Sequence, residues 1–185
     1  FKLGQDSVDG LTVAVQGAGN VGYHLCRFLN EAGAKLVVAD IDQARVSRVV
    51  DEFGARAVAL DELVSQKVDV LAPCALGAVF SSSTIPTLQT TVVAGGANNQ
   101  LETDADGQRL HDAGILYAPD YVINGGGIIN VASEYYGDAT DDEIWERIAE
   151  IGPRLTGIFE ESANSNTPTN AVADRQARKI IDSVA

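Results

Sequence analysis

The stretch that decides the fold is residues 11–22, "LTVAVQGAGNVG". Its first part, Leu11–Val15, is an apolar run with the length and composition of a buried strand. A helical period follows, ending near Gly33, and we expect one buried face made of Val21, Leu25, Phe28 and Leu29. A strand, a glycine-rich turn and a helix in that order are typical of a phosphate-binding loop, although they also describe a plain turn.

The glycines of this turn have the G-x-G-x-x-G spacing, at Gly17, Gly19 and Gly22. The first permits the tight turn, the second lets a pyrophosphate approach the backbone, and the third lets the helix pack closely on the strand. The helix then presents its free N–H groups and partial positive charge to the phosphates. We therefore expect the whole loop to bind a pyrophosphate, including the intervening Ala18, Asn20 and Val21.

An acidic residue follows at the place where such a loop requires one. Asp40 ends the second apolar run, "KLVVAD", 18 residues after Gly22. A carboxylate there accepts hydrogen bonds from the adenosine ribose and repels a 2′-phosphate, and Ile41 and Asp42 follow it rather than arginine. This pattern favours NAD over NADP. The alternative interpretation is a glycine turn followed by a capping aspartate.

The rest of the first 140 residues continues the alternation of short apolar runs and helical periods. Further strands are expected at Lys35–Asp40, Val68–Ala72, Thr91–Ala94 and Ile115–Tyr117. One helix is expected to bury a face made of Val46, Val49, Val50 and Phe53, and two more are expected over Asp61–Gln66 and Thr103–Ala113. Such alternation predicts an α/β fold, a doubly wound and mostly parallel sheet of the Rossmann type, over residues 10–140.

Residues 141–185 have a different pattern, which predicts C-terminal helices. One long stripe comprises Ile144, Ile148, Ile151, Leu155, Ile158 and Phe159. The last helix is expected to turn inward Val172, Ala173, Ala177, Ile180, Ile181 and Val184. These helices either cap the sheet, which we favour, or reach toward another part of a longer protein.

Composition narrows the choice of partners. With 26 acidic and 13 basic residues the net charge is −13, a field that repels nucleic-acid backbones and anionic membranes. Neither partner is therefore expected.

Cys26 and Cys74 match no metal-binding spacing, so no metal site is predicted, and Cys26 is expected in the core of a cytoplasmic protein. Because the chain starts at Phe1 and contains no methionine, we expect it to be part of a longer one.

Two further loops follow expected strands and flank the place for a nicotinamide. They are "APCALG" (Ala72–Gly77) and "GGANNQ" (Gly95–Gln100). Ligands of parallel sheets sit outside the carboxyl ends of the strands, where both loops lie. Asn98 and Asn99 offer donors and acceptors to a carboxamide or a substrate, or they are loop-forming residues.

These loops, with "VAVQGAGNVG" and "YAPDYVINGGGIINV", resemble the glutamate/leucine/phenylalanine/valine dehydrogenase family, most closely its leucine and other branched-chain or aromatic members. The likeness runs from about Gly10 to Gly137 and is looser beyond. It implies reversible oxidative deamination of an L-amino acid to a 2-oxo acid and ammonia, with hydride passing to NAD. It also implies a homo-oligomer.

The resemblance assigns roles to individual residues. Gly17–Gly22 would bind the pyrophosphate, and Asp40, with Ile41 beside it, the adenosine ribose. Cys74, Ala75 and Leu76 would line the cofactor cleft, and Asn98 and Asn99 would lie near the nicotinamide. Ile128 and Val131 would wall the side-chain pocket, favouring an aliphatic substrate; from spacing alone they are helix core.

One departure from the family concerns the chemistry itself. The catalytic lysine, the carboxylate-binding lysine and the acid/base aspartate of the family belong to a preceding domain, and no such glycine-rich lysine motif occurs here. We therefore predict no catalytic residue in this chain, and expect His24 and His111 to be ordinary helix residues. A non-catalytic NAD sensor is the alternative from another class; a methyltransferase-type fold is disfavoured because the strand-end loops match the dehydrogenases.

Overall fold

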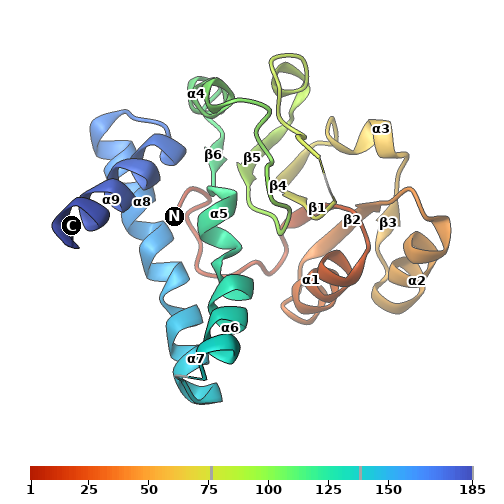
Figure 1. Ribbon diagram of the computed structural model, residues 1–185. Coiled ribbons are helices and arrows are strands. Elements are labelled where there is room, and N and C mark those ends of the chain that lie inside the picture. Colours follow the sequence, from red (N-terminus) through yellow and green to blue (C-terminus); the bar gives the residue numbers. More distant parts are fainter. Residues whose placement is uncertain (76, 138, 185) are drawn as a thin grey trace.

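The computed structural model describes residues 1–75, 77–137 and 139–184. It contains a parallel sheet with the strand order β3-β2-β1-β4-β5-β6 (Figure 1). The strands are β1 (Thr12–Gln16), β2 (Lys35–Ala39), β3 (Arg56–Ala57), β4 (Val68–Pro73), β5 (Thr90–Val93) and β6 (Leu116–Tyr117).

Both faces of the central strands are buried, as their continuous apolar sequences predict. In β1, Val13 and Val15 enter one core cluster and Ala14 enters the other, because successive side chains point to opposite faces. The first cluster includes Cys26 and Val49, and the second includes residues of the helices on the other side. Helices therefore cover both faces, and the prediction of a doubly wound sheet is confirmed.

The helices are listed here in chain order. They are α1 (Asn20–Glu31), α2 (Gln43–Phe53), α3 (Leu60–Leu63), the 3-10 turn η1 (Ile85–Thr87), α4 (Asp104–Asp112), α5 (Asp120–Ile123), α6 (Gly125–Tyr136), α7 (Asp141–Ala149), α8 (Ile151–Ser165) and α9 (Thr169–Val184). Helices α1 and α2 supply the cluster that contains Val13, and α3 and α4 the cluster that contains Ala14.

The buried face of α1 differs from the expected one. Gly22 and Cys26 are its buried residues, whereas Val21 and Phe28 are 53% and 56% exposed. Gly22 and Cys26 lie one helical turn apart and turn toward the sheet, which rotates Val21 out to the loop edge. The prediction that Val21 and Phe28 belong to the core was therefore wrong.

Residues after 140 form helices, but the expected single stripe is divided between two of them. Helix α7 ends at Ala149 and α8 begins at Ile151; Leu155 and Ile158 are buried, whereas Ile144 is only half-buried. Helix α8 packs against α5 and α9, and α9 contacts α4 and the edge strand β6. In Figure 1, α6 and α7 extend away from the sheet.

The inward face of α9 is shorter than its sequence suggests. Val172 and Ala173 are buried, but Ala177 is exposed, as are Ile180 and Ile181, at 64% and 65%. The side chain of Val184 lies outside the described part. The first turns of α9 face Ile158 of α8, and the later turns run past the packed region, so the prediction that the whole stripe points inward was wrong.

Candidate functional site

The glycine loop lies where β1 and β4 are neighbours and the connections from the two strands diverge. Gly17 has a φ of +95°, a conformation that favours glycine, and its N–H donates to the Ala39 carbonyl at 2.8 Å. A Cβ at Gly22 would overlap the carbonyl oxygen of Gly17, so the third glycine closes the turn against the first. Crevices at such a switch point are the ligand sites of doubly wound sheets.

Helix α1 begins directly after this loop. Its N-cap is Gly19, and within the described residues no side chain caps its first amides. The first N–H groups of a helix have no partner inside the helix, and they carry the positive end of its dipole. The first amides of α1, from Gly19 and Asn20 onward, therefore carry the positive end of the helix dipole beside the glycine loop.

Asp40 is buried beside this loop, at the end of β2. Its Oδ2 accepts a hydrogen bond from the Ala18 N–H at 2.6 Å, and its Oδ1 accepts one from the Asp42 N–H at 2.8 Å. A carboxylate can accept about two hydrogen bonds at each oxygen, so both oxygens keep capacity for a ligand. Ile41, by contrast, is 87% exposed at the rim.

The loop after β4 packs directly on the glycine loop. The Cys74 N–H donates to the Gln16 carbonyl at 2.7 Å, and a Cβ added to Gly17 would lie 3.0 Å from that of Ala75. Burial raises the pKa of the Cys74 thiol above its usual value, so at neutral pH the sulfur is a protonated, weakly polar wall. Leu76 lies outside the described residues.

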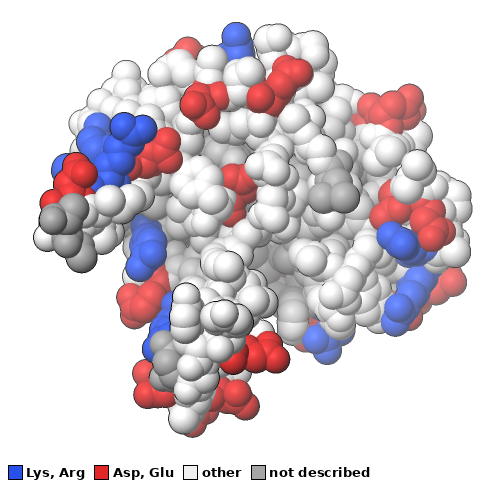
Figure 2. Space-filling model, in the orientation of Figure 1, with Lys and Arg blue, Asp and Glu red and all other residues white. Residues whose placement is uncertain are grey.

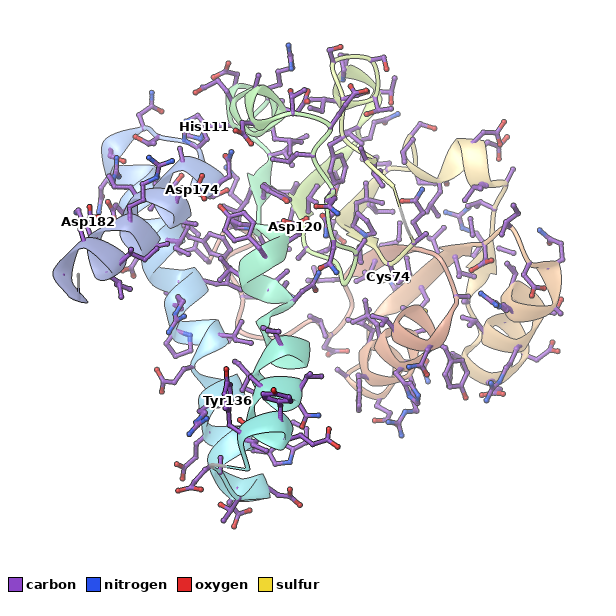
Figure 3. The ribbon with its side chains drawn as sticks, in the orientation of Figure 1. Cys74, His111, Asp120, Tyr136, Asp174 and Asp182 are labelled. Carbon is purple, nitrogen blue, oxygen red and sulfur yellow. The ribbon has the colours of Figure 1, made fainter. Side chains whose placement is uncertain are left out.

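The loop after β5 is held by two buried polar side chains that sequence reasoning did not single out. Gln100 donates from Nε2 to the carbonyls of Gly95 and Ala97, at 3.0 and 2.9 Å. Its backbone N–H donates to Asp120 Oδ2 at 3.0 Å, so the first residue of α5 fixes this loop. Figure 3 labels Asp120 at that position. The available signal for Asp120 was its place just after β6, which ends at Tyr117.

The two asparagines of this loop have different surroundings. Asn99 has a φ of +55°, a left-handed conformation that asparagine tolerates, so its presence has a local structural reason. Asn98 Oδ1 accepts from Asn124 Nδ2 at 3.1 Å, and Asn124 also donates to the Ala97 carbonyl at 2.9 Å. The carbonyl oxygen of Asn98 therefore has a partner within the chain, whereas its Nδ2 donates to no group among the described residues.

An open hollow lies between α1, α6 and the loop after β5, Gly95–Gln100, which we call the asparagine loop. Its walls include Val21, Gly96, Asn98, Tyr121, Ile123, Asn124, Gly125, Gly126, Gly127, Ile128 and Val131. Ile128 and Val131 are 69% and 58% exposed, so they are not helix core. In Figure 2 the charged side chains gather mainly around the rim of the face shown, and much of its centre is uncharged.

Other polar residues lie away from this hollow. His24 is exposed on α1, and His111 on α4 pairs with Asn166 Oδ1 at 3.1 Å. The described lining of the hollow contains no lysine.

Nowhere in the described chain do three or more His, Cys, Asp or Glu side chains gather to hold a metal ion. None of the described helices combines the length and apolar character that a membrane-spanning segment needs.

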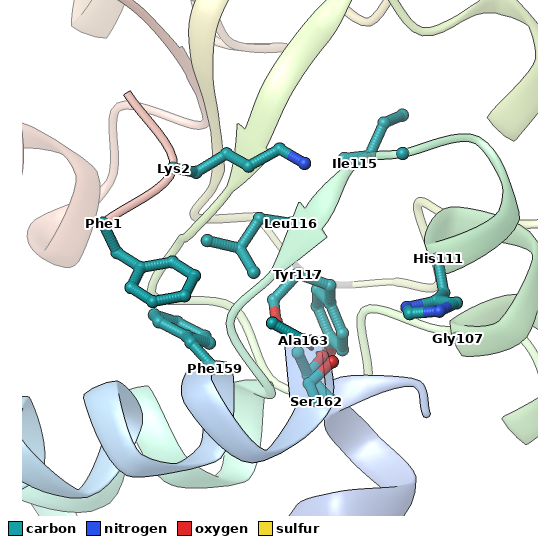
Figure 4. A pocket seen from close by; sticks show the side chains of 12 residues that line it. Phe1, Lys2, Gly107, His111, Ile115, Leu116, Tyr117, Phe159, Ser162 and Ala163 are labelled. Atoms are coloured by element: carbon teal, nitrogen blue, oxygen red, sulfur yellow. Dashed lines mark hydrogen bonds between the residues drawn. The ribbon is translucent and has the colours of Figure 1, made fainter. Parts of the chain in front are cut away.

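A second cavity lies between β6, α4 and α8, away from the three loops (Figure 4). Phe1 and Phe159 face each other there, with ring centroids 5.9 Å apart. Polar groups of its wall bond within the chain: Thr169 Oγ1 donates to the Tyr117 carbonyl at 2.7 Å, and Ser162 Oγ to the Thr167 carbonyl at 2.6 Å. We assign this cavity no ligand.

Comparison with known proteins shows the family of the chain. Residues 39–181 match the model of the Glutamate/Leucine/Phenylalanine/Valine dehydrogenase family. The chain belongs to this family. Members with different names are almost equally similar to it: leucine dehydrogenase of Geobacillus stearothermophilus is 47% identical over 98% of the chain, and L-tryptophan dehydrogenase of Nostoc punctiforme is 45% identical over 95%.

Structural comparison gives the same family. A crystal structure of L-tryptophan dehydrogenase from Nostoc punctiforme superimposes with a TM-score of 0.92, at 43% identity over 97% of this chain and 55% of that one. The chain spans about half the length of the curated relatives, 49% of the Geobacillus protein and 50% of the Nostoc protein.

Proposed function

We propose that this chain is the cofactor-binding part of an NAD-dependent L-amino-acid dehydrogenase. The reaction is the reversible oxidative deamination of a branched-chain aliphatic amino acid, such as leucine, to its 2-oxo acid and ammonia. The observation that carries the proposal is the arrangement of loops at the carboxyl ends of the strands. There, the glycine loop with Asp40 can hold a dinucleotide, and the hollow between α1 and α6 can hold a small apolar side chain.

For the cofactor, the residues present fit NAD. The amides at the start of α1 would hold the pyrophosphate, and the free lone pairs of Asp40 the two ribose hydroxyls. A 2′-phosphate would be placed against this carboxylate, which supports NAD over NADP. When bound, the nicotinamide ring supplies the hydride acceptor.

For the substrate, the chain contributes shape and donors. Asn98 and Asn124 border the hollow, and the side chain of Asn98 keeps its N–H donors free toward a carboxamide or carboxylate. Ile128 and Val131 form part of the apolar wall and narrow the hollow, which favours aliphatic over aromatic substrate side chains. The two hydrophobic residues would discriminate by only about 1–3 kcal/mol per methylene.

Proton transfer is assigned elsewhere. No lysine lies in the described lining of the hollow, and burial raises the pKa of the Cys74 thiol, which stays protonated at neutral pH. In this proposal the chain binds the cofactor and orients the substrate, while the acid/base and carboxylate-binding groups come from the remainder of the enzyme. We extend the proposal to a homo-oligomer in the cytoplasm, supported by the resemblance and by the free thiols of Cys26 and Cys74.

There are two alternative functions. An aromatic amino-acid dehydrogenase is supported by the tryptophan-named relative, whose sequence identity to this chain is within a few per cent of that of the leucine-named relative. A non-catalytic NAD sensor would use the same loop.

The test is NADH formation by the full-length enzyme with L-leucine, L-phenylalanine or L-tryptophan. We expect the highest kcat/KM with leucine, and no turnover by residues 1–185 alone. A preference for an aromatic substrate would contradict the aliphatic assignment, and inactivity with all amino acids, despite NAD binding, would favour the sensor.

A further inference from the structure

A guanidinium group stands over the middle of the glycine loop. Arg45, in the first turn of α2, places Nη1 3.5 Å from the position that a Cβ on Gly19 would occupy. Among the described residues, apart from the chain neighbours of Gly19, no other heavy atom lies within 4 Å of that position. The space above the second glycine is thus bordered by one cation.

Asp42 determines where this cation points. Its Oδ1 accepts from the Ala44 N–H at 2.9 Å and so caps α2, while its Oδ2 lies 3.3 Å from Arg45 Nε. The carboxylate therefore engages the Nε edge of the guanidinium. Nη1, which this carboxylate does not engage, lies toward the glycine loop.

The position matters because the second glycine of such a loop is the one over which a pyrophosphate approaches the backbone. In a chain of net charge −13, a dianionic group needs a local positive charge. The guanidinium matches phosphate oxygens with paired N–H donors, which the compact ammonium of a lysine does not. We infer that Arg45 binds the pyrophosphate of the dinucleotide and, with the amides of α1, offsets the acidic field of the chain.

This inference rests on the proposed function, and it concerns the pyrophosphate rather than the adenosine ribose. The ribose place is defined by the Asp40 carboxylate at Ala18, whereas Nη1 of Arg45 lies over Gly19. Removing the guanidinium should therefore weaken NAD and NADP by the same factor and leave their ratio unchanged. A residue that reads the 2′-position would change the ratio.

The experiment compares wild type, Arg45→Gln and Arg48→Gln by calorimetric titration with ADP-ribose, NAD and NADP. Arg48 is the matched control because it lies on the same helix, pairs through Nε with Glu52 Oε1 at 2.8 Å, and stacks over Tyr23. The side chains of Arg45 and Arg48 are 55% and 58% exposed, so neither change should alter the unfolding temperature.

We expect Arg45→Gln to weaken all three ligands about two- to fivefold at low ionic strength, as for an exposed charge pair. The difference should shrink at high salt because the interaction is screened, and Arg48→Gln should bind like wild type. Unchanged affinity of Arg45→Gln, an equal loss in Arg48→Gln, or a loss confined to NADP would overturn the inference while leaving the proposed function intact. No binding of any ligand by wild type would overturn both.

Discussion

The carboxylate of Asp40 accepts a hydrogen bond from the backbone N–H of Ala18 at 2.6 Å, in the middle of the glycine loop. Its other oxygen accepts from the Asp42 N–H, so one buried side chain connects the loops after β1 and β2. Asp40, which the sequence predicts as a ribose-binding residue or a capping aspartate, thus holds the glycine loop through its own hydrogen bonds. Changes at Asp40 should affect stability and binding together.

Replacing Asp40 with alanine leaves two backbone donors without their acceptor. We expect the free energy of unfolding to fall by about 1–3 kcal/mol, the cost of unsatisfied buried groups. Urea denaturation measures it. Asp51→Ala is the control, since Asp51 is exposed on α2 and its loss should cost within about 0.5 kcal/mol. Equal stability of the two variants would show that the Ala18 contact does not hold the loop.

Asp120 should have a similar effect on the asparagine loop. Its oxygens accept from the N–H groups of Gln100 and Tyr121, at 3.0 and 2.8 Å. Asp120→Ala is expected to lower the free energy of unfolding by about 1–3 kcal/mol and to reduce the affinity for NAD more than for ADP-ribose, because only NAD carries a nicotinamide. Asp182→Ala, on the exposed end of α9, is the control. An equal loss for both ligands would contradict a role for this loop at the nicotinamide.

Ile128 provides the test of the substrate wall. In the full-length enzyme, Ile128→Ala should raise the ratio of kcat/KM for phenylalanine to that for leucine, because a larger hollow accepts the ring. The exposed Ile128 makes little core contact, so the unfolding temperature should not change. Ile181→Ala, similarly exposed on α9, should leave the ratio unaltered. An unchanged ratio in Ile128→Ala would show that residue 128 does not contact the substrate.

The thiols offer a test that depends on pH. Burial raises the pKa of Cys74, and it raises that of Cys26 to about 12. Because the thiolate is the reactive form, alkylation by iodoacetamide should be slow at pH 7 and accelerate as the pH rises. Cys74 should react before the fully buried Cys26, and NAD should protect it. Mass spectrometry of the alkylated peptides measures both rates; equal rates with and without NAD would place Cys74 outside the cofactor cleft.

Most of the order of strands and helices was predictable, because the central strands are apolar on both faces, but α5 was not among the expected helices. The sequence also placed the glycine loop, Asp40 and the asparagine loop at the carboxyl ends of the strands. The two-residue β3, Arg56–Ala57, was not predicted: both residues are exposed and carry no apolar signal. It pairs in parallel with β2, Arg56 opposite Val37 and Ala57 opposite Val38.

Burial directions were less predictable than elements. The helical spacing of the apolar residues in α1 assigns Val21 to the buried face. Val21 instead faces the hollow, because Gly22 and Cys26 are the residues that pack on the sheet. The same limit applies to Ile180 on α9, because a repeat shows which residues share a face and not how far the packing continues. Asp120 and Gln100 carry no periodic signal at all, and their connection depends on loops 20 residues apart in sequence.

The most direct measurement is a calorimetric titration of residues 1–185 with NAD and NADP, in wild type and in Asp40→Ala. We predict that wild type binds NAD more tightly than NADP. Asp40→Ala should lower the affinity for NAD and narrow the difference between the two affinities, since the ribose acceptor and the repulsion of a 2′-phosphate are lost together. Tighter binding of NADP, or identical affinities in the two proteins, would contradict the assignment of this edge of the sheet as an NAD site.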